Sequence, residues 1–287
     1  MALSTSTAPE LTAEQVSRIL TKPLEAASVF LAAGPRIFDT AGPLRIPSLP
    51  ASGAAALTFV GENEAIPEAD AEFGEVSLMP STMDSVKVIT RYSNELARQS
   101  VVSLEAAIRD RLVADVAARL DAQFLGDAGD GIDTPFGLFA YPGVTDTAVT
   151  GPLTPDVILA AQGDALARNL DPSRLTLFVR PEDYVGVRGL KDADGRYLIA
   201  PDASGTGLVV PILGARAVIT ARIPEGRAAL VDMSRLAVAR DQAPTVKVLT
   251  ERYADYDQQA VRVTARYDAK PLDASAVLTL SGLTAGA

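Results

Sequence analysis

The residues best spaced to bind a cation are Asp127, Asp130 and Asp133, which lie three apart in the segment GDAGDGIDTPFG. Calcium loops of the EF-hand type carry acidic ligands at alternate positions and a distal glutamate, so this spacing does not match them. Aspartate and glycine are also the residues that most often form turns. We therefore interpret residues 126–137 as a turn and predict no metal site there.

The sequence contains neither histidine nor cysteine. Their absence excludes disulfides, thiolate chemistry and any Ser–His–Asp arrangement. No glycine-rich stretch is followed by Lys-Ser or Lys-Thr, so a phosphate-binding loop is also missing. A hydrolase with two converging carboxylates remains as an enzymatic alternative, but nothing in the sequence pairs two of them. We predict a protein that is not an enzyme, with no catalytic residue, cofactor or metal.

Residues 51–80 hold an unusual concentration of acid and contain no lysine or arginine. The carboxylates are Glu62, Glu64, Glu68, Asp70, Glu72 and Glu75. Apolar clusters at 57–60 and 76–79 flank them, which predicts a two-stranded excursion with a polar tip near Pro67. An isolated ribbon is marginal in water, so we expect another surface to cover it. The alternative is a solvated acidic loop.

A basic surface on a neighbouring subunit would suit this acidic segment. The predicted long helix and the stretch just before it offer Arg98, Arg109, Arg111 and Arg119, and the C-terminal part offers Arg262 and Arg266. The sequence does not decide between the two sets. We take the six carboxylates together with Arg98 and Arg109 as candidate interface residues.

The chain of 287 residues has a formal net charge of −10, which repels phosphate. If the protein encloses nucleic acid, it is expected to act as a wall and not as a counterion. No apolar run approaches the ~20 residues that a membrane helix needs, and no secretion signal opens the sequence. We expect a soluble protein made in a cytoplasm, with no membrane partner.

A long helix is predicted over residues 100–125. Apolar residues recur there every four positions, and this spacing places them in one stripe along the helix. They are Leu104, Ile108, Leu112, Val116, Leu120 and Phe124. About 25 residues at 1.5 Å each make a rod of roughly 37 Å, which suggests the spine of an elongated molecule. The alternative is an ordinary core helix of a compact domain.

Other elements follow from local patterns. Short helices are expected after residue 12 and over 24–33, with the second ended by Gly34-Pro35, and the proline-rich segment 34–50 is expected to be an extended arm. Residues 84–92 alternate as a half-buried strand, and residues 151–232 alternate helix and strand. Strands at 245–250, 261–268 and 276–280 should form a closing sheet that packs against the long helix.

Three stretches in this order resemble the Hong Kong 97-type major capsid proteins of tailed bacteriophages. The first is Phe124-Leu125-Gly126-Asp127 followed by Pro135-Phe136-Gly137-Leu138. The second is Leu190-Lys191-Asp192 with Gly195-Arg196-Tyr197, and the third is Arg262 to Arg266 followed by Pro271 and Ala274 to Leu280. The similarity covers roughly Leu24 to Leu280.

The resemblance implies an α+β, Hong Kong 97-like capsid fold with five parts. These are N-terminal helices and an arm (1–50), a β-hairpin E-loop (51–83), the first part of a peripheral P-domain with the spine helix (84–150), an axial A-domain (151–232) and the closing sheet of the P-domain (233–287). Some members crosslink an E-loop lysine to a neighbouring asparagine. This E-loop has no lysine, and Gln259 and Arg266 stand at the positions that resemble those of the family's crosslinking partners. We therefore do not expect crosslinking in this protein.

The resemblance also implies what the protein assembles with. Such proteins form hexamers and pentamers that close into an icosahedral shell around double-stranded DNA, without sequence-specific binding. The implied partners are a portal and either a separate scaffolding protein or no scaffolding protein. The implied location is the virion capsid, which is assembled in the bacterial host cytoplasm. An encapsulin, the shell protein of a bacterial compartment with the same fold, is the main alternative.

Overall fold

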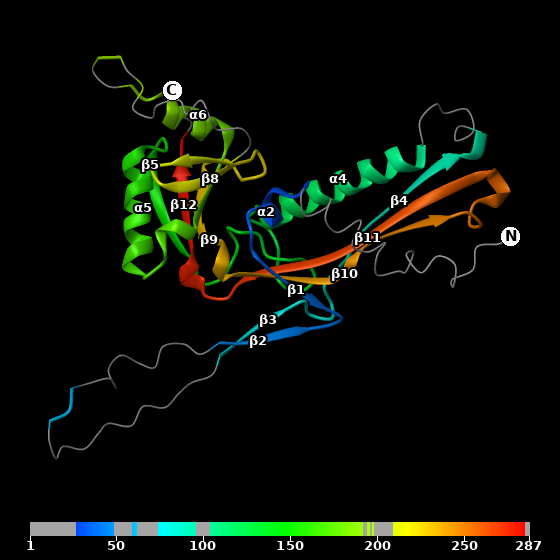
Figure 1. The fold of residues 1–287 in the computed structure, drawn as a ribbon, viewed down its shortest axis with the longest axis horizontal. Coiled ribbons are helices and arrows are strands. Elements are labelled where there is room, and N and C mark those ends of the chain that lie inside the picture. The colour runs from blue at the N-terminus through cyan, green and yellow to red at the C-terminus, as the bar shows by residue number, and fades with distance from the viewer. Residues whose placement is uncertain are drawn as a thin grey trace, which may run out of the picture.

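The computed structural model describes residues 27–48, 59–61, 74–95, 104–191, 194–195, 197 and 209–284. Figure 1 shows an elongated molecule with a helix-flanked sheet at one end and a long helix lying over a second sheet at the other. A two-stranded ribbon leaves the region between them. The expected mixture of helices and sheets is therefore present.

A four-stranded sheet in the order β1-β10-β11-β4 forms one end of the molecule. Its strands are β1 (Arg36–Thr40), β10 (Leu236–Leu249), β11 (Gln258–Pro271) and β4 (Val86–Ser93). β1 runs parallel to β10, and the other two pairs are antiparallel. The long helix α4 (Leu104–Phe124) crosses one face of this sheet (Figure 1).

The predicted stripe of α4 is the face that packs on this sheet. Leu112, Val116, Leu120 and Phe124 are buried and Ile108 is partly buried, whereas the side chain of Leu104 lies outside the described part. The predicted alternation of β4 is also confirmed, with Lys87, Ile89 and Arg91 exposed on the opposite face. The four-residue repeat in α4 and the alternation in β4 therefore each predicted which side of the element faces this core.

A six-stranded sheet in the order β5-β12-β9-β6-β8-β7 forms the other end. Its strands are β5 (Thr145–Gly151), β12 (Val277–Leu283), β9 (Arg227–Asp232), β6 (Leu175–Val179), β8 (Ala215–Ile219) and β7 (Val209–Ile212). Helices α5 (Pro155–Ala167) and α6 (Pro181–Gly189) accompany it, and the Thr154 side chain caps α5 as its sequence predicts. Short 3-10 turns lie at Pro172–Arg174, Met233–Arg235, Ala254–Tyr256 and Ala274–Ala276.

The last strand does not join the sheet that the sequence suggested. β12 lies between β5 and β9 in the six-stranded sheet, and not beside β10 and β11 under the spine helix. β12 lies outside the block of residues 151–232, yet it pairs with β9 of that block, and β5 joins the same sheet through β12. Leu278 and Leu280 are buried there among the side chains of the six-stranded sheet. Local alternation predicts that a segment is a strand but not which strand it pairs with.

The segment expected to be an extended arm, residues 34–50, contains two strands within its described part. Arg36–Thr40 pairs with β10 as β1, and β2 (Leu44–Ser48) pairs antiparallel with β3 (Gly74–Leu78). Pro47 stands inside β2 opposite Glu75. A proline is tolerated there because β2 and β3 form a sheet of only two strands, in which every strand is an edge.

The start of the described chain is tied to the spine helix. The short helix α2 (Val29–Ala32) ends before Gly34, as predicted, while residues 12–26 of the predicted helices lie outside the described residues. Buried Asp121 of α4 accepts hydrogen bonds from the Ser28 hydroxyl at 2.6 Å and from the Val29 and Phe30 amides at 2.9 and 3.1 Å. This carboxylate thus satisfies backbone donors at the free end of α2.

Candidate subunit interfaces

Two of the eight predicted interface residues, Glu75 and Arg109, are among the residues that the structure describes. Glu75 is exposed on β3, and its carboxylate lies 3.8 Å from the Arg45 guanidinium across the β2–β3 ribbon. Arg109 is half-buried on α4 and interacts within its own chain. Glu62, Glu64, Glu68, Asp70, Glu72 and Arg98 lie outside the described residues. Glu75 and Arg109 are not in contact with each other, so no intramolecular acid–base cluster forms from this pair.

The root of the β2–β3 ribbon packs against the face of the four-stranded sheet that α4 leaves open. Leu78, Met79 and Met83 are buried against Ala237 and Ala239 of β10. The expected partner for residues 76–79 was the apolar cluster at 57–60, whereas the observed partner is β2. The ribbon is therefore rooted on a sheet of its own subunit, which gives its base the packing that an isolated pair of strands lacks.

Three side chains from alternate positions of β11 hold the main chain of this root. Arg266 donates to the carbonyls of Pro80 and Ser81 at 2.8 and 3.2 Å, and the Lys270 ammonium donates to the Ser77 carbonyl at 2.9 Å. Between them, Asp268 accepts the Met79 amide at 2.7 Å. We call Arg266, Asp268 and Lys270 the β11 clamp. It fixes the point at which the ribbon leaves the subunit.

Asp268 is the one fully buried member of the clamp. Asp268 lies on the face of β11 opposite to the side chains that pack against α4, and it is buried because the ribbon root covers that face. Burial raises the pKa of its carboxyl, although hydrogen bonds from the Met79 and Ala269 amides and the charges of Lys270 and Arg266 oppose the rise. Burial and the charge of Asp268 likewise raise the pKa of Tyr141, whose hydroxyl donates to the Ala269 carbonyl at 3.0 Å.

The aspartate-rich loop after α4 is a turn, as predicted. One carboxylate oxygen of Asp130 accepts the amides of Ile132, Asp133 and Thr134 at 2.9–3.0 Å, and these bonds lower the pKa of Asp130 to about 2. Gly131 has a φ of +68°, and a Cβ there would lie 2.1 Å from the Phe136 ring. Within the described ranges no three acidic residues are grouped so that they could hold a metal ion.

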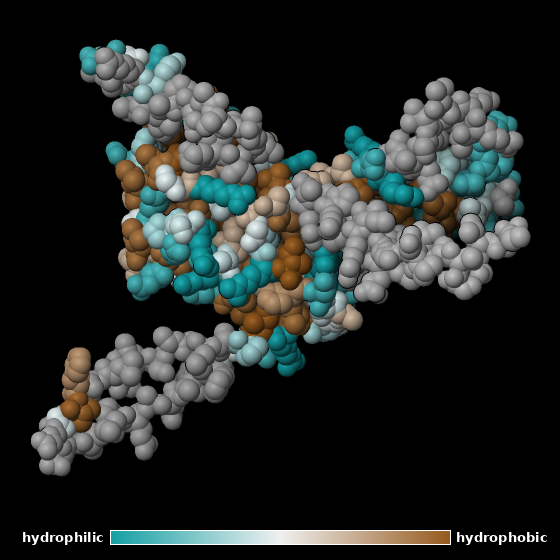
Figure 2. All heavy atoms as spheres, in the orientation of Figure 1, coloured by the Kyte–Doolittle hydropathy of each residue, from teal (hydrophilic) through white to brown (hydrophobic). Residues whose placement is uncertain are grey.

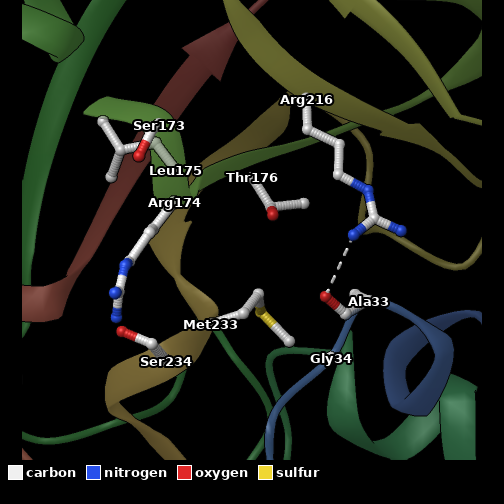
Figure 3. Close-up of a pocket in the computed structure, with 9 residues that line it drawn as sticks. All are labelled: Ala33, Gly34, Ser173, Arg174, Leu175, Thr176, Arg216, Met233 and Ser234. Carbon is white, nitrogen blue, oxygen red and sulfur yellow. Dashed lines mark hydrogen bonds between the residues drawn. The ribbon is translucent and has the colours of Figure 1, made fainter. Parts of the chain in front are cut away.

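The pocket in Figure 3 lies where the chain leaving α2 passes the six-stranded sheet, and its volume is about 290 Å³. Thr176 and Met233 line it, and Arg216 donates to the Ala33 carbonyl at 3.5 Å. The hydroxyls of Ser173 and Ser234 also line it, but each donates to a neighbouring aspartate at 2.7 Å. No pair of carboxylates is among its lining residues, which is the feature that a hydrolase of the kind considered above would need.

A family model described as the phage capsid family matches residues 11–282. The chain belongs to the phage capsid family. No curated protein sequence matches it. Among the helices of the described residues, none combines the length and the apolar character that a membrane span requires.

Solved structures agree on the fold of this capsid protein. The capsid of an empty GTA particle superposes with a TM-score of 0.71 at 16% identity, over 89% of this chain and 90% of that chain. A chain from Mycobacterium phage Bobi gives 0.69 at 21% identity, over 98% and 99%. One from Microbacterium phage Oxtober96 gives 0.65 at 18%, over 98% and 99%. The Hong Kong 97-like capsid fold expected from the sequence is confirmed.

Family membership also confirms the predicted function as a shell-forming major capsid protein. The place of such a capsid protein is the virion shell. These matches give no support to the encapsulin or hydrolase alternatives. The clamp and the Asp121 contact were missed by sequence analysis, because each joins residues at least 91 positions apart through main-chain groups that leave no sequence signature.

Proposed function

We propose that this capsid protein forms hexamers and pentamers that close into an icosahedral shell around a double-stranded DNA phage genome. The observation that supports the proposal is an exposed aromatic side chain on the part of the molecule that projects from its body. Phe59 is fully exposed, and residues 59–61 lie far from both sheets at the end of the ribbon side of the molecule (Figure 1). Figure 2 shows them as a small hydrophobic group set apart from the body.

An aromatic side chain in that position is unfavourable in water unless another molecule buries it. Neighbouring subunits are the surface that a repeating shell supplies. We infer that the ribbon and the acidic segment that follows Gly61 serve as interface elements between subunits, with Glu62, Glu64, Glu68, Asp70, Glu72 and Glu75 as contact residues. Arg98 and Arg109 remain proposed interface residues of the spine region.

The parts of the fold suggest how the subunits are arranged. We propose that residues 1–50 act as an arm, 51–83 as the E-loop, 84–150 and 233–287 as the P-domain and 151–232 as the A-domain near the capsomer axis. Strands β5 and β12 would then belong with the A-domain sheet, because they pair within it. A portal and a separate scaffolding protein are proposed partners, and assembly is proposed to occur in the host cytoplasm. The net charge of −10 favours enclosing DNA without tight binding.

Electron microscopy and light scattering of the purified full chain test this function. We expect rings or closed shells, formed by the chain alone or after addition of its scaffolding partner. A second preparation, made without nucleic acid, separates assembly from DNA binding. A chain that stays monomeric at every concentration and salt, even with its viral partners, would contradict the proposal.

A further inference from the structure

The pocket in Figure 3 lies between the two halves of the subunit. On one side is the six-stranded sheet, which supplies Thr176 of β6 and Arg216 of β8. On the other side is the chain leaving α2, which supplies Ala33 and Gly34. The pocket volume of about 290 Å³ is close to the lower limit of roughly 300 Å³ for small-molecule sites, so the pocket suits a small ligand.

Thr176 is the polar residue of an otherwise apolar strand. β6 has the sequence Leu-Thr-Leu-Phe-Val, and all five residues are buried. Thr176 itself is 3% exposed, and its hydroxyl forms no hydrogen bond with any residue that the structure describes. Buried hydroxyls nearly always have a hydrogen-bond partner, because an unpaired one costs free energy. This hydroxyl points into the pocket (Figure 3), so a ligand oxygen there would accept a hydrogen bond from it.

Arg216 stands beside Thr176, because the two are direct partners in the parallel pairing of β6 with β8. Its guanidinium donates to the Ala33 carbonyl at 3.5 Å, which is longer than the roughly 3.2 Å of ordinary N–H···O bonds. Among the described residues, no carboxylate forms an ion pair with Arg216. Most of its hydrogen-bonding capacity is therefore available to a ligand.

Arg174 lies across the pocket from Arg216, with Thr176 between them (Figure 3). Its guanidinium is 3.5 Å from the Asp171 carboxylate, and both of these side chains are more than half exposed. An exposed pair of this kind is worth only about 0–1 kcal/mol, so Arg174 can exchange this partner for another anion.

The acidic groups next to the pocket are engaged in their own turns. Asp171 accepts the Ser173 amide and hydroxyl, and Asp232 accepts the Ser234 amide and hydroxyl. Neither aspartate is among the lining residues. The pocket is therefore lined by two arginines and no carboxylate, in a chain whose net charge is −10.

We propose that this pocket binds a phosphate group, held by the guanidinium groups of Arg174 and Arg216 and by the Thr176 hydroxyl. Guanidinium groups match the oxygens of phosphate, and donors from three directions suit a tetrahedral anion better than a planar carboxylate. The arginines need only change rotamer to contact it. Because Arg216 also holds the Ala33 carbonyl, the bound anion would stabilise the junction between the two halves. This inference does not depend on the proposed shell function.

Titration of the full-length, unassembled chain with inorganic phosphate tests the site. Isothermal titration calorimetry and thermal unfolding are both measured at constant ionic strength, adjusted with chloride. Acetate and glycerol phosphate are titrated in the same way. The variants are Arg216→Gln, Thr176→Val and Thr176→Ser. The matched control is Arg222→Gln, which removes the same charge from an exposed arginine that does not line the pocket.

We expect saturable binding of phosphate by the parent chain. The unfolding midpoint should rise by about 2–4 °C when phosphate is present at about ten times its dissociation constant. Arg216→Gln and Thr176→Val should each weaken binding about tenfold or more, because each removes a donor to the anion. Thr176→Ser keeps the hydroxyl and should stay within about threefold of the parent, and Arg222→Gln should bind like the parent.

The two other ligands identify the chemistry that the pocket prefers. Acetate should bind about tenfold more weakly than phosphate, since a carboxylate fills fewer of the donor directions. Tighter binding of glycerol phosphate than of inorganic phosphate would show that the ligand is a small phosphate ester, and weaker binding that it is the free ion. Acetate binding as tight as that of phosphate would contradict the proposed preference.

The inference is overturned if the midpoint rises in proportion to phosphate without saturating, because exclusion of the anion from the protein surface produces such a rise without a site. It is also overturned if Arg222→Gln weakens binding as much as Arg216→Gln does, or if Thr176→Val binds as well as Thr176→Ser. Circular dichroism checks that the variants fold. Arg216 is exposed, so its variant decides the matter even if a substitution of buried Thr176 impairs folding.

Discussion

The carboxylate of Asp268 on β11 accepts the main-chain amide of Met79 at 2.7 Å, and the two residues are 189 positions apart in the chain. Both side chains are fully buried, and Met79 holds a left-handed backbone with a φ of 55°. Such a φ is uncommon for a residue other than glycine. The contact thus holds the ribbon root in a conformation that its local sequence would not favour by itself.

Removing the acceptor at this contact is expected to loosen the ribbon. Asp268→Ala leaves the Met79 amide buried without a partner, which should lower the free energy of unfolding by about 1–3 kcal/mol. Asp268→Asn keeps one acceptor oxygen and should be destabilised less. Urea unfolding of the unassembled chain measures both. Equal losses in the two variants would show that the hydrogen bond to Met79 is not what stabilises the root.

The raised pKa of Asp268 also predicts a direction for pH dependence. The folded state takes up this proton before the unfolded state does, so acidification through the interval between the raised pKa and the ordinary value of about 3.9 relieves the cost of the buried charge. The stability of the parent relative to Asp268→Asn should therefore increase as pH falls from 7 into that interval. Unfolding of both proteins at several pH values measures the difference, and a difference that decreases on acidification would contradict the assignment.

The contact between Asp121 and the start of α2 is predicted to hold the N-terminal segment on the spine. Asp121→Ala removes the acceptor of one hydroxyl and two amides, and we expect a loss of about 1–3 kcal/mol together with faster proteolysis near residues 28–34. Asp115→Ala is the matched control on the same helix, because its exposed pair with Arg111 is worth about 0–1 kcal/mol. Proteolysis at the same rate in the two variants would argue against this role of Asp121.

Phe59 should matter to assembly and not to the subunit. Its side chain is fully exposed, so Phe59→Ala is expected to leave the melting temperature of the unassembled chain unchanged. Assembly should require a concentration several-fold higher, since burial of an aromatic ring against a neighbour would be lost. Phe30→Ala is the opposite case, because that ring is buried against Phe124 with centroids 5.0 Å apart. A Phe59 variant that assembles like the parent would remove this residue from the interface.

The mature shell is expected to hold together without covalent links between subunits. Residues 51–80 contain no lysine. Arg266 stands at one of the positions that resemble those of the crosslinking partners, and its guanidinium already binds the Pro80 carbonyl and the Asp241 carboxylate. Particles boiled in detergent should release a single band near 30.0 kDa. A ladder of larger bands, absent from the unassembled chain treated in the same way, would show that this expectation is wrong.

The sequence by itself determined which segments form the spine helix, helices α5 and α6, strands β6, β7 and β8, and the alternating strands β4 and β11, but it did not indicate β9. These elements depend on periodicity and on caps, such as Thr154 before α5 and the stripe from Leu112 to Phe124, and such signals act over a few residues. The order of these elements, together with three short motifs, was enough to predict the capsid family to which the chain belongs. The absence of histidine and cysteine narrowed the possible chemistry on composition alone.

Only the tertiary structure decided which strands pair and which faces are covered. The sequence of β12 predicts a strand but not its neighbours, and the structure places it between β5 and β9. In the same way, Asp268 and Arg262 lie on the same face of β11, and both are charged residues at the alternate positions between its apolar residues. The ribbon root covers Asp268 and leaves Arg262 half-exposed, because burial depends on what packs from elsewhere in the chain.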